Sequence, residues 1–108
     1  MEDKNKTGWI CSSSDTANHG MKKTQMVVVD DFEKVKEFMK VNIESIKETV
    51  DDYIKDGTLS IVKEIAEDDF YYISLKNNNH SMFECDNIWF RLESFEFTYN
   101  ILFNFNSF

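Results

Sequence analysis

The residues of this chain that could do chemistry are two histidines, two cysteines and 20 carboxylates. His80, Glu84, Cys85 and Asp86 stand close together and include the ligand types that zinc and other transition metals prefer. If residues 81–85 form a strand, however, the side chains of Glu84 and Cys85 point to opposite sides of it. A set of two or three mixed ligands is a weak basis for a metal centre, so we expect neither a metal nor another cofactor.

Catalytic motifs that depend on glycine or on a fixed histidine spacing are absent from this sequence. The chain has three glycines and no proline, and neither a glycine-rich phosphate loop nor the HExxH, CxxC or GxSxG pattern can be written from it. Nothing in the spacing brings Cys11 or Cys85 to a histidine. Adjacent carboxylates such as Asp68 and Asp69, on a turn, more often point to water than into an active site. The sequence therefore predicts a protein that is not an enzyme.

The acidic residues are concentrated in one part of the chain. They outnumber the basic residues 20 to 12, which gives a net charge of −8, and residues 64–96 carry eight of them against Lys76 and Arg91. The electric field of this negative charge attracts cationic surfaces and speeds association with them. The alternative explanation is that the acidity serves solubility alone. Direct binding of nucleic acid is not expected, because phosphate contacts need an excess of lysine and arginine. The predicted partner-binding residues are Glu67, Asp68, Asp69, Glu84, Asp86, Glu93 and Glu96.

The strongest local pattern predicts one long helix over about 31–56. Apolar residues recur along this segment at steps of three and four, which places them on one side of a helix. Asp30 and Glu33 resemble a capping box at its start, with Asp30 as the cap, and Gly57 stands where a helix C-terminus is expected. The mixed charges on the other side of the helix are typical of a solvent-exposed face.

Strands are predicted before and after this helix. Residues 25–29 are a β-branched run that we expect to be a buried strand, and residues 1–24 are expected to be a loose arm or a short first strand. Residues 58–66 fit both a strand and a second short helix, and the acidic residues that follow favour the helix. Beyond this point, aromatic and β-branched residues predict strands over 70–76, 81–85 and 88–93.

The C-terminal segment alternates between apolar and polar residues. Every second residue from Phe95 to Phe105 is apolar, and Leu102 is the one exception on the polar side. We expect the apolar side to pack against the helix. An exposed edge strand that pairs with a copy of the chain or with a partner is a second interpretation, and an apolar ligand pocket between helix and sheet is a third.

Together these patterns predict a single α+β domain over 1–108. It consists of one long amphipathic helix packed on an antiparallel sheet of about four to six strands, with a second short helix as an option. Within it, 1–24 is the arm, 25–57 a strand plus the long helix, and 58–108 mainly antiparallel strands. No stretch approaches the roughly 20 apolar residues that span a bilayer, and the start lacks the apolar core of a secretory signal. We therefore expect a cytoplasmic protein, in a bacterium or an infected host cell, without membrane contact.

A compact acidic chain without catalytic motifs is best interpreted as an inhibitor of a nucleic-acid-binding enzyme, such as a nuclease. Its carboxylates would block the basic cleft of that enzyme by mimicking the charge of nucleic acid. The profile of size and charge is similar to that of small acidic phage-encoded inhibitors of bacterial defence nucleases, including anti-CRISPR proteins. Alternatives are an immunity protein that neutralises a toxin nuclease and a small ligand-binding α+β domain with an aromatic pocket. A homodimer through an edge strand is compatible with all of them.

Overall fold

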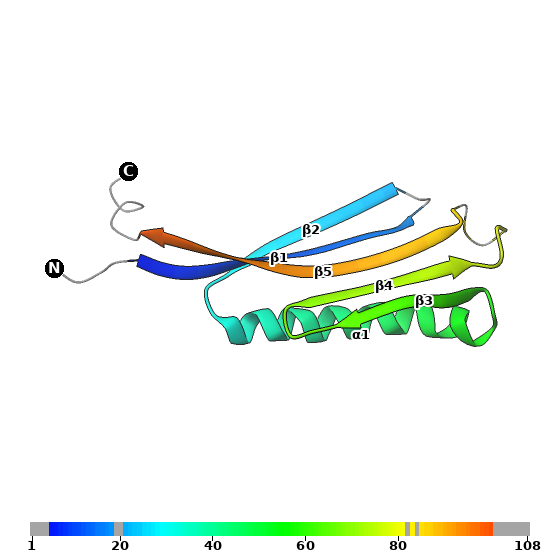
Figure 1. Cartoon of the computed structure of the whole chain (residues 1–108), viewed down its shortest axis with the longest axis horizontal. Coiled ribbons are helices and arrows are strands. Elements are labelled where there is room, and N and C mark those ends of the chain that lie inside the picture. Colours follow the sequence, from blue (N-terminus) through cyan, green and yellow to red (C-terminus); the bar gives the residue numbers. More distant parts are fainter. Residues whose placement is uncertain (1–4, 19–20, 82, 84, 101–108) are drawn as a thin grey trace.

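The computed structural model describes residues 5–18, 21–81, 83 and 85–100. In this part of the chain one α-helix packs on a five-stranded antiparallel sheet of strand order β2-β1-β5-β4-β3 (Figure 1). The fold is therefore α+β, as the sequence predicts. The elements are β1 (Asn5–Asn18), β2 (Met21–Val29), α1 (Phe32–Lys55), β3 (Leu59–Ala66), β4 (Phe70–Asn77) and β5 (Asn87–Asn100).

The two longest strands, β1 and β5, lie side by side in the interior of the sheet. Each has 14 residues, and their pairing runs from Asn5 opposite Asn100 to Asp15 opposite Phe90. The expectation of a loose arm or a short first strand over 1–24 is corrected here, because Asn5–Asn18 form a long interior strand and residues 21–24 belong to β2. Pairing with neighbours on both sides compensates for its serine-rich sequence, as tertiary context commonly does in sheets.

Beyond the ends of their neighbours, β1 and β5 continue as a two-stranded ribbon. Pairing of β2 with β1 reaches only as far as Val29 opposite Trp9, and α1 begins soon after (Figure 1). In the ribbon the ring of Phe97 covers Gly8, where a Cβ atom would lie 2.7 Å from the ring carbon Cζ. A larger residue at Gly8 would therefore displace the ring of Phe97.

Residues at both ends of helix α1 determine where it begins and where it ends. Asp31 is extended, with φ −142°, and its carboxylate accepts a hydrogen bond of 2.8 Å from the backbone N–H of Glu33. Asp31 is therefore the N-cap, rather than Asp30, whose carboxylate accepts a bond of 2.8 Å from Lys34 instead. Gly57 takes the left-handed conformation with φ +84° just after the helix, which confirms the predicted C-terminal signal. The predicted helix is confirmed to within one residue at each end.

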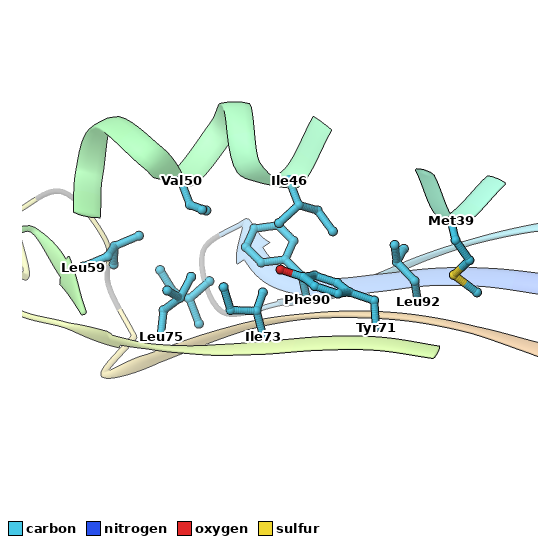
Figure 2. Packing of buried hydrophobic residues seen from close by; sticks show 10 residues of the cluster. Met39, Ile46, Val50, Leu59, Tyr71, Ile73, Leu75, Phe90 and Leu92 are labelled. Atoms are coloured by element: carbon cyan, nitrogen blue, oxygen red, sulfur yellow. The ribbon is translucent and has the colours of Figure 1, made fainter. Parts of the chain in front are cut away.

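The hydrophobic core lies between α1 and the facing side of β4 and β5 (Figure 2). Alternate residues of β4 are buried, and Tyr71, Ile73 and Leu75 point toward the helix. The hydroxyl of Tyr71 donates a hydrogen bond of 2.6 Å to Glu64 Oε2, so its polar end is satisfied within the core. The fully or largely buried cluster consists of Met39, Ile46, Val50, Leu59, Tyr71, Ile73, Leu75, Ile88, Phe90 and Leu92.

The structure corrects the secondary structure expected for two segments after the helix. Residues 58–66 do not form a second short helix, because Leu59–Ala66 is strand β3, paired with β4. No strand forms over the described residues of 81–85, which instead belong to the loop between β4 and β5. Buried Asn77 connects this loop to the end of β4 by two hydrogen bonds. Its Nδ2 donates to the carbonyl oxygens of Phe83 and Cys85 at 2.8 Å each.

Two expectations about burial are also wrong. Strand β2 exists, but it is an edge strand whose Met26, Val27 and Val28 are exposed rather than buried. The aromatic side of β5 does not pack on α1: the core residues Ile88, Phe90 and Leu92 have even numbers, whereas Phe95 and Phe97 have odd numbers. Because β5 is one continuous strand, these two sets point to opposite faces of the sheet. The residues of the alternating pattern beyond 100 lie outside the described part of the chain.

Candidate functional site

The hairpin loop between β3 and β4 presents three consecutive carboxylates, which we call the acidic turn (Glu67, Asp68 and Asp69). Ala66 pairs with Tyr71, and the backbone N–H of Glu67 donates to the carbonyl of Phe70 at 2.8 Å. These contacts leave Asp68 and Asp69 as a two-residue loop. All three acidic side chains are exposed. The structure therefore holds them in the solvent at the end of a well-paired hairpin.

Glu93 lies next to the acidic turn, since it stands opposite Phe70 in the pairing of β4 with β5. Its side chain is only 24% exposed and accepts a hydrogen bond of 3.1 Å from Arg91 Nε. The guanidinium of Arg91 also lies over the ring of Phe70, 5.5 Å from the ring centroid. Glu93 is thus partly neutralised, and it contributes less to the negative field outside the molecule than Asp68 and Asp69 do.

The remaining predicted site residues lie elsewhere. Asp86 stands at the other end of β4, a strand of eight residues that spans roughly 25 Å. Its carboxylate contacts His80 Nε2 at 2.6 Å. Glu96 pairs with Trp9, whose ring packs on Phe32 of α1, so Glu96 lies on the helix side of the sheet, away from the side that carries Glu93. Glu84 lies outside the described residues. The six predicted residues that the structure describes therefore do not form one surface; among them, the acidic turn and Glu93 come together.

The cysteines and histidines were the other candidates for chemistry. Cys11 is completely buried, and this burial raises the pKa of its thiol. Cys85 is half-buried, with its Sγ 3.9 Å from the carbonyl oxygen of Thr16. Among the residues that the structure describes, no three or more potential ligands gather into a group that could hold a metal ion. Nor does α1 combine the length and the apolar character that crossing a membrane would require.

A wide hollow of about 670 Å³ lies beside the start of α1 and is lined by Val28, Val29, Asp30, Lys34, Phe97 and Tyr99. Two smaller hollows lie between α1 and the sheet. One is apolar, about 110 Å³ in volume, and includes Tyr53, Phe83 and Phe90 in its lining. This volume is well below the ~300 Å³ at which typical ligand pockets begin. The other hollow, of about 230 Å³, lies toward β1 and β2 and is mostly polar; its lining residues are Ser13, Asp15, Gln25, Asn42, Ser45, Ile46, Thr49 and Phe90. Neither hollow has the size and apolar lining of the predicted aromatic pocket.

The sheet surface that faces away from α1, which we call the open face, is a feature that the sequence reasoning missed. Val28, Ile10 and Phe95 stand opposite one another on β2, β1 and β5 and form an apolar row across it. Val28 is 64% exposed and Phe95 is 56% exposed. The signal was present in the sequence as the change from even to odd apolar positions between Leu92 and Phe95, provided that β5 is taken as one strand.

Comparison of the chain with protein-family models, with curated proteins and with solved structures finds no match. The class of the protein is therefore defined by its own architecture, an α+β fold with one helix on one face of a five-stranded antiparallel sheet. What this architecture presents to the solvent is an acidic turn at one end of the sheet and an apolar open face.

Proposed function

We propose that this protein is a non-enzymatic inhibitor that binds a nucleic-acid-binding enzyme, such as a nuclease, and blocks its basic cleft. The observation that carries the proposal is the exposed two-residue loop of Asp68 and Asp69, with Glu67 beside it. Carboxylates form strong charge-assisted hydrogen bonds with the arginine and lysine side chains that otherwise hold phosphates. The acidic turn would thus compete with nucleic acid for the same cationic groups.

The narrow shape of the molecule and the closed hairpin loop support such a role. The protein is narrow, with extents of 62 × 24 × 17 Å, and the loop is closed by the contact between Glu67 and Phe70. A carboxylate pair on a short hairpin loses little conformational freedom on binding, which favours affinity. The net charge of −8 adds long-range attraction to a basic cleft.

The proposal extends to a cellular setting of the phage anti-defence or anti-CRISPR type, in the cytoplasm of a bacterium or infected host cell. An immunity protein against a toxin nuclease would use the same acidic turn, and the identity of the enzyme that is bound distinguishes the two settings. A ligand-binding role has less support, because the apolar hollow between helix and sheet is only about 110 Å³.

The experiment is affinity capture of the tagged full chain from native lysate, at low and high salt, followed by mass spectrometry. The test variant is D68K/D69K, and the control is E44K/E48K, which makes the same change in net charge on the exposed side of α1. We expect wild type and control to recover the same nucleic-acid-binding enzyme, with recovery weakened by salt, and D68K/D69K to recover at least about tenfold less. Unchanged recovery by D68K/D69K would overturn the proposal, and so would capture of the bait alone.

A further inference from the structure

The polar hollow of about 230 Å³ lies between α1 and the strands β1, β2 and β5. A helix is about 10 Å wide and neighbouring strands lie about 4.8 Å apart, so one helix covers roughly two strands of a sheet. The hydrophobic core lies under α1 on β4 and β5, and the helix side of β1 and β2 extends beyond that core. The hollow is therefore built where the cover of the single helix ends.

The register of the strands places three polar side chains on the helix side of the sheet. Ser13 stands opposite Leu92 on β5 and opposite Gln25 on β2, and Asp15 stands opposite Phe90. Leu92 and Phe90 point toward α1 (Figure 2), and residues directly opposite each other in antiparallel strands share a face. The strands thus line the hollow with a hydroxyl, an amide and a carboxylate.

Helix α1 lines the hollow with Asn42, Ser45 and Thr49, which steps of three and four place on one side of the helix. Asn42 Nδ2 donates a hydrogen bond of 2.8 Å to the carbonyl oxygen of Phe38, and the hydroxyl of Thr49 donates one of 2.9 Å to that of Ser45. The amide oxygen of Asn42 and the hydroxyl oxygen of Thr49 can still accept hydrogen bonds. Side chains that are already ordered in this way lose less freedom when a ligand binds.

Part of the lining is apolar. Ile46 of α1 and Phe90 of β5 both line the hollow and both belong to the buried core. Figure 2 shows the side chain of Ile46 pointing toward the ring of Phe90. The hollow thus combines several convergent polar groups with an apolar wall, which is the usual composition of a small-molecule site.

The charge and the size of the hollow restrict the ligand that it suits. Among the described residues that line it there is no lysine or arginine, and Asp15 is the single carboxylate, so neither a phosphate nor a metal ion finds a matching set of groups. The volume of about 230 Å³ is that of roughly seven water molecules in the liquid. Because Gln25, Ser45 and Thr49 are exposed, one small molecule can enter from the solvent.

We propose that this hollow binds a small uncharged polyhydroxyl compound of the size of a monosaccharide. Hydroxyl groups both donate and accept, so they pair with the hydroxyl, amide and carboxylate groups of the lining, while the C–H groups of the sugar ring pack on Ile46 and Phe90. A carboxylate has about four acceptor positions, and Asp15 can therefore serve the ligand and a protein partner together. The acidic turn lies between β3 and β4, outside this lining, so the site is independent of the proposed inhibitory function.

The first test is titration of the isotope-labelled full chain with D-glucose, D-galactose and D-mannose, followed by NMR of the backbone amides. We expect saturable shifts with at least one sugar, centred on Ser13, Gln25, Asn42 and Ser45, with a Kd on the order of 1 mM for a ligand of so few atoms. The phosphorylated form of that sugar should bind at least about tenfold more weakly. No saturable shift with any of the three sugars would overturn the proposal, and so would shifts centred on the acidic turn or the open face.

The second test changes the lining. Asn42→Leu and Ser13→Val each remove hydrogen-bonding groups at similar size, and each should weaken sugar binding by roughly fivefold. Ser74→Val is the matched control, because Ser74 alternates with the buried Ile73 and Leu75 and faces away from α1, and it should bind as wild type does. Thermal unfolding identifies a variant that loses its fold, in which case the other variant and the phosphorylated sugar decide. Unchanged binding by folded Asn42→Leu and Ser13→Val contradicts the proposal.

Discussion

At the scale of single residues, a few side chains determine where the elements begin and how polar groups enter the core. Asp31 satisfies a free N–H at the start of α1, and Gly57 allows the left-handed turn at its end. Tyr71 carries a hydroxyl into the core because Glu64 accepts a hydrogen bond from it. Such roles depend on one atom in one place, so each can be tested by a single substitution.

Replacing Asp31 by alanine should lower the free energy of unfolding by about 1 kcal/mol, the usual value of an N-cap side chain. The two neighbouring aspartates give a built-in comparison, because Asp30 makes an exposed ion pair with Lys34 and does not cap the helix. Asp30→Ala should therefore cost clearly less. Urea denaturation of both variants measures the difference, and an equal or reversed order would show that the cap is misassigned.

Burial and the hydrogen bond to Glu64 both raise the pKa of Tyr71 above its usual value near 10. Above pH 10 the unfolded chain therefore loses a proton that the folded chain keeps, and the free energy of unfolding falls as pH rises. The slope from this group approaches about 1.4 kcal/mol per pH unit. Tyr71→Phe should remove that slope, whereas Tyr72→Phe, on the other face of β4, should keep it. Unfolding curves between pH 8 and pH 12 for the two variants decide the matter, and parallel pH profiles would refute the role of Tyr71.

At the scale of elements, what could be predicted from sequence depended on whether a signal was local. The helix over 31–56 was predictable because periodicity and end signals lie within the segment itself. Strand β1 was not, because its serine-rich sequence is stabilised by pairing with β2 and with β5, and β5 is distant in the chain. The segment 58–66 was ambiguous for the same reason, since pairing with β4 decides it.

Strand β5 shows a second reason why the sequence alone was not sufficient: the face on which each residue lies depends on whether β5 is one continuous strand. Each half of the strand alternates clearly, but the choice of face requires knowing that no bulge separates Leu92 from Phe95. Of the candidate site, the exposure of the acidic turn could be predicted from its turn-like sequence. The separation of Asp86 and Glu96 from that turn could not, because it depends on strand length and register.

The opposite faces of β5 lead to opposite consequences of truncation. Leu92 is completely buried against α1, and Leu92→Ala should cost about 2–5 kcal/mol of the free energy of unfolding. Phe95 is 56% exposed on the open face, and Phe95→Ala should cost less than about 1 kcal/mol despite the larger side chain. Chemical denaturation compares the two. A larger loss for Phe95→Ala would mean that the aromatic side of β5 is covered.

At the scale of the whole molecule, the sheet separates two surfaces of different character. The acidic turn lies beside β3, and the exposed apolar residues Met26, Val27 and Val28 lie on β2, on the other side of the sheet (Figure 1).

The most direct test of the inhibitory account is displacement of nucleic acid from the captured enzyme. A fluorescent duplex oligonucleotide bound to that enzyme is titrated with the protein, and its anisotropy is measured. We expect the oligonucleotide to be released, at protein concentrations that rise with both oligonucleotide and salt concentration, and we expect D68K/D69K to release it far less effectively than E44K/E48K. If the oligonucleotide stays bound while the protein saturates the enzyme, the basic cleft is not the binding site and the account is contradicted.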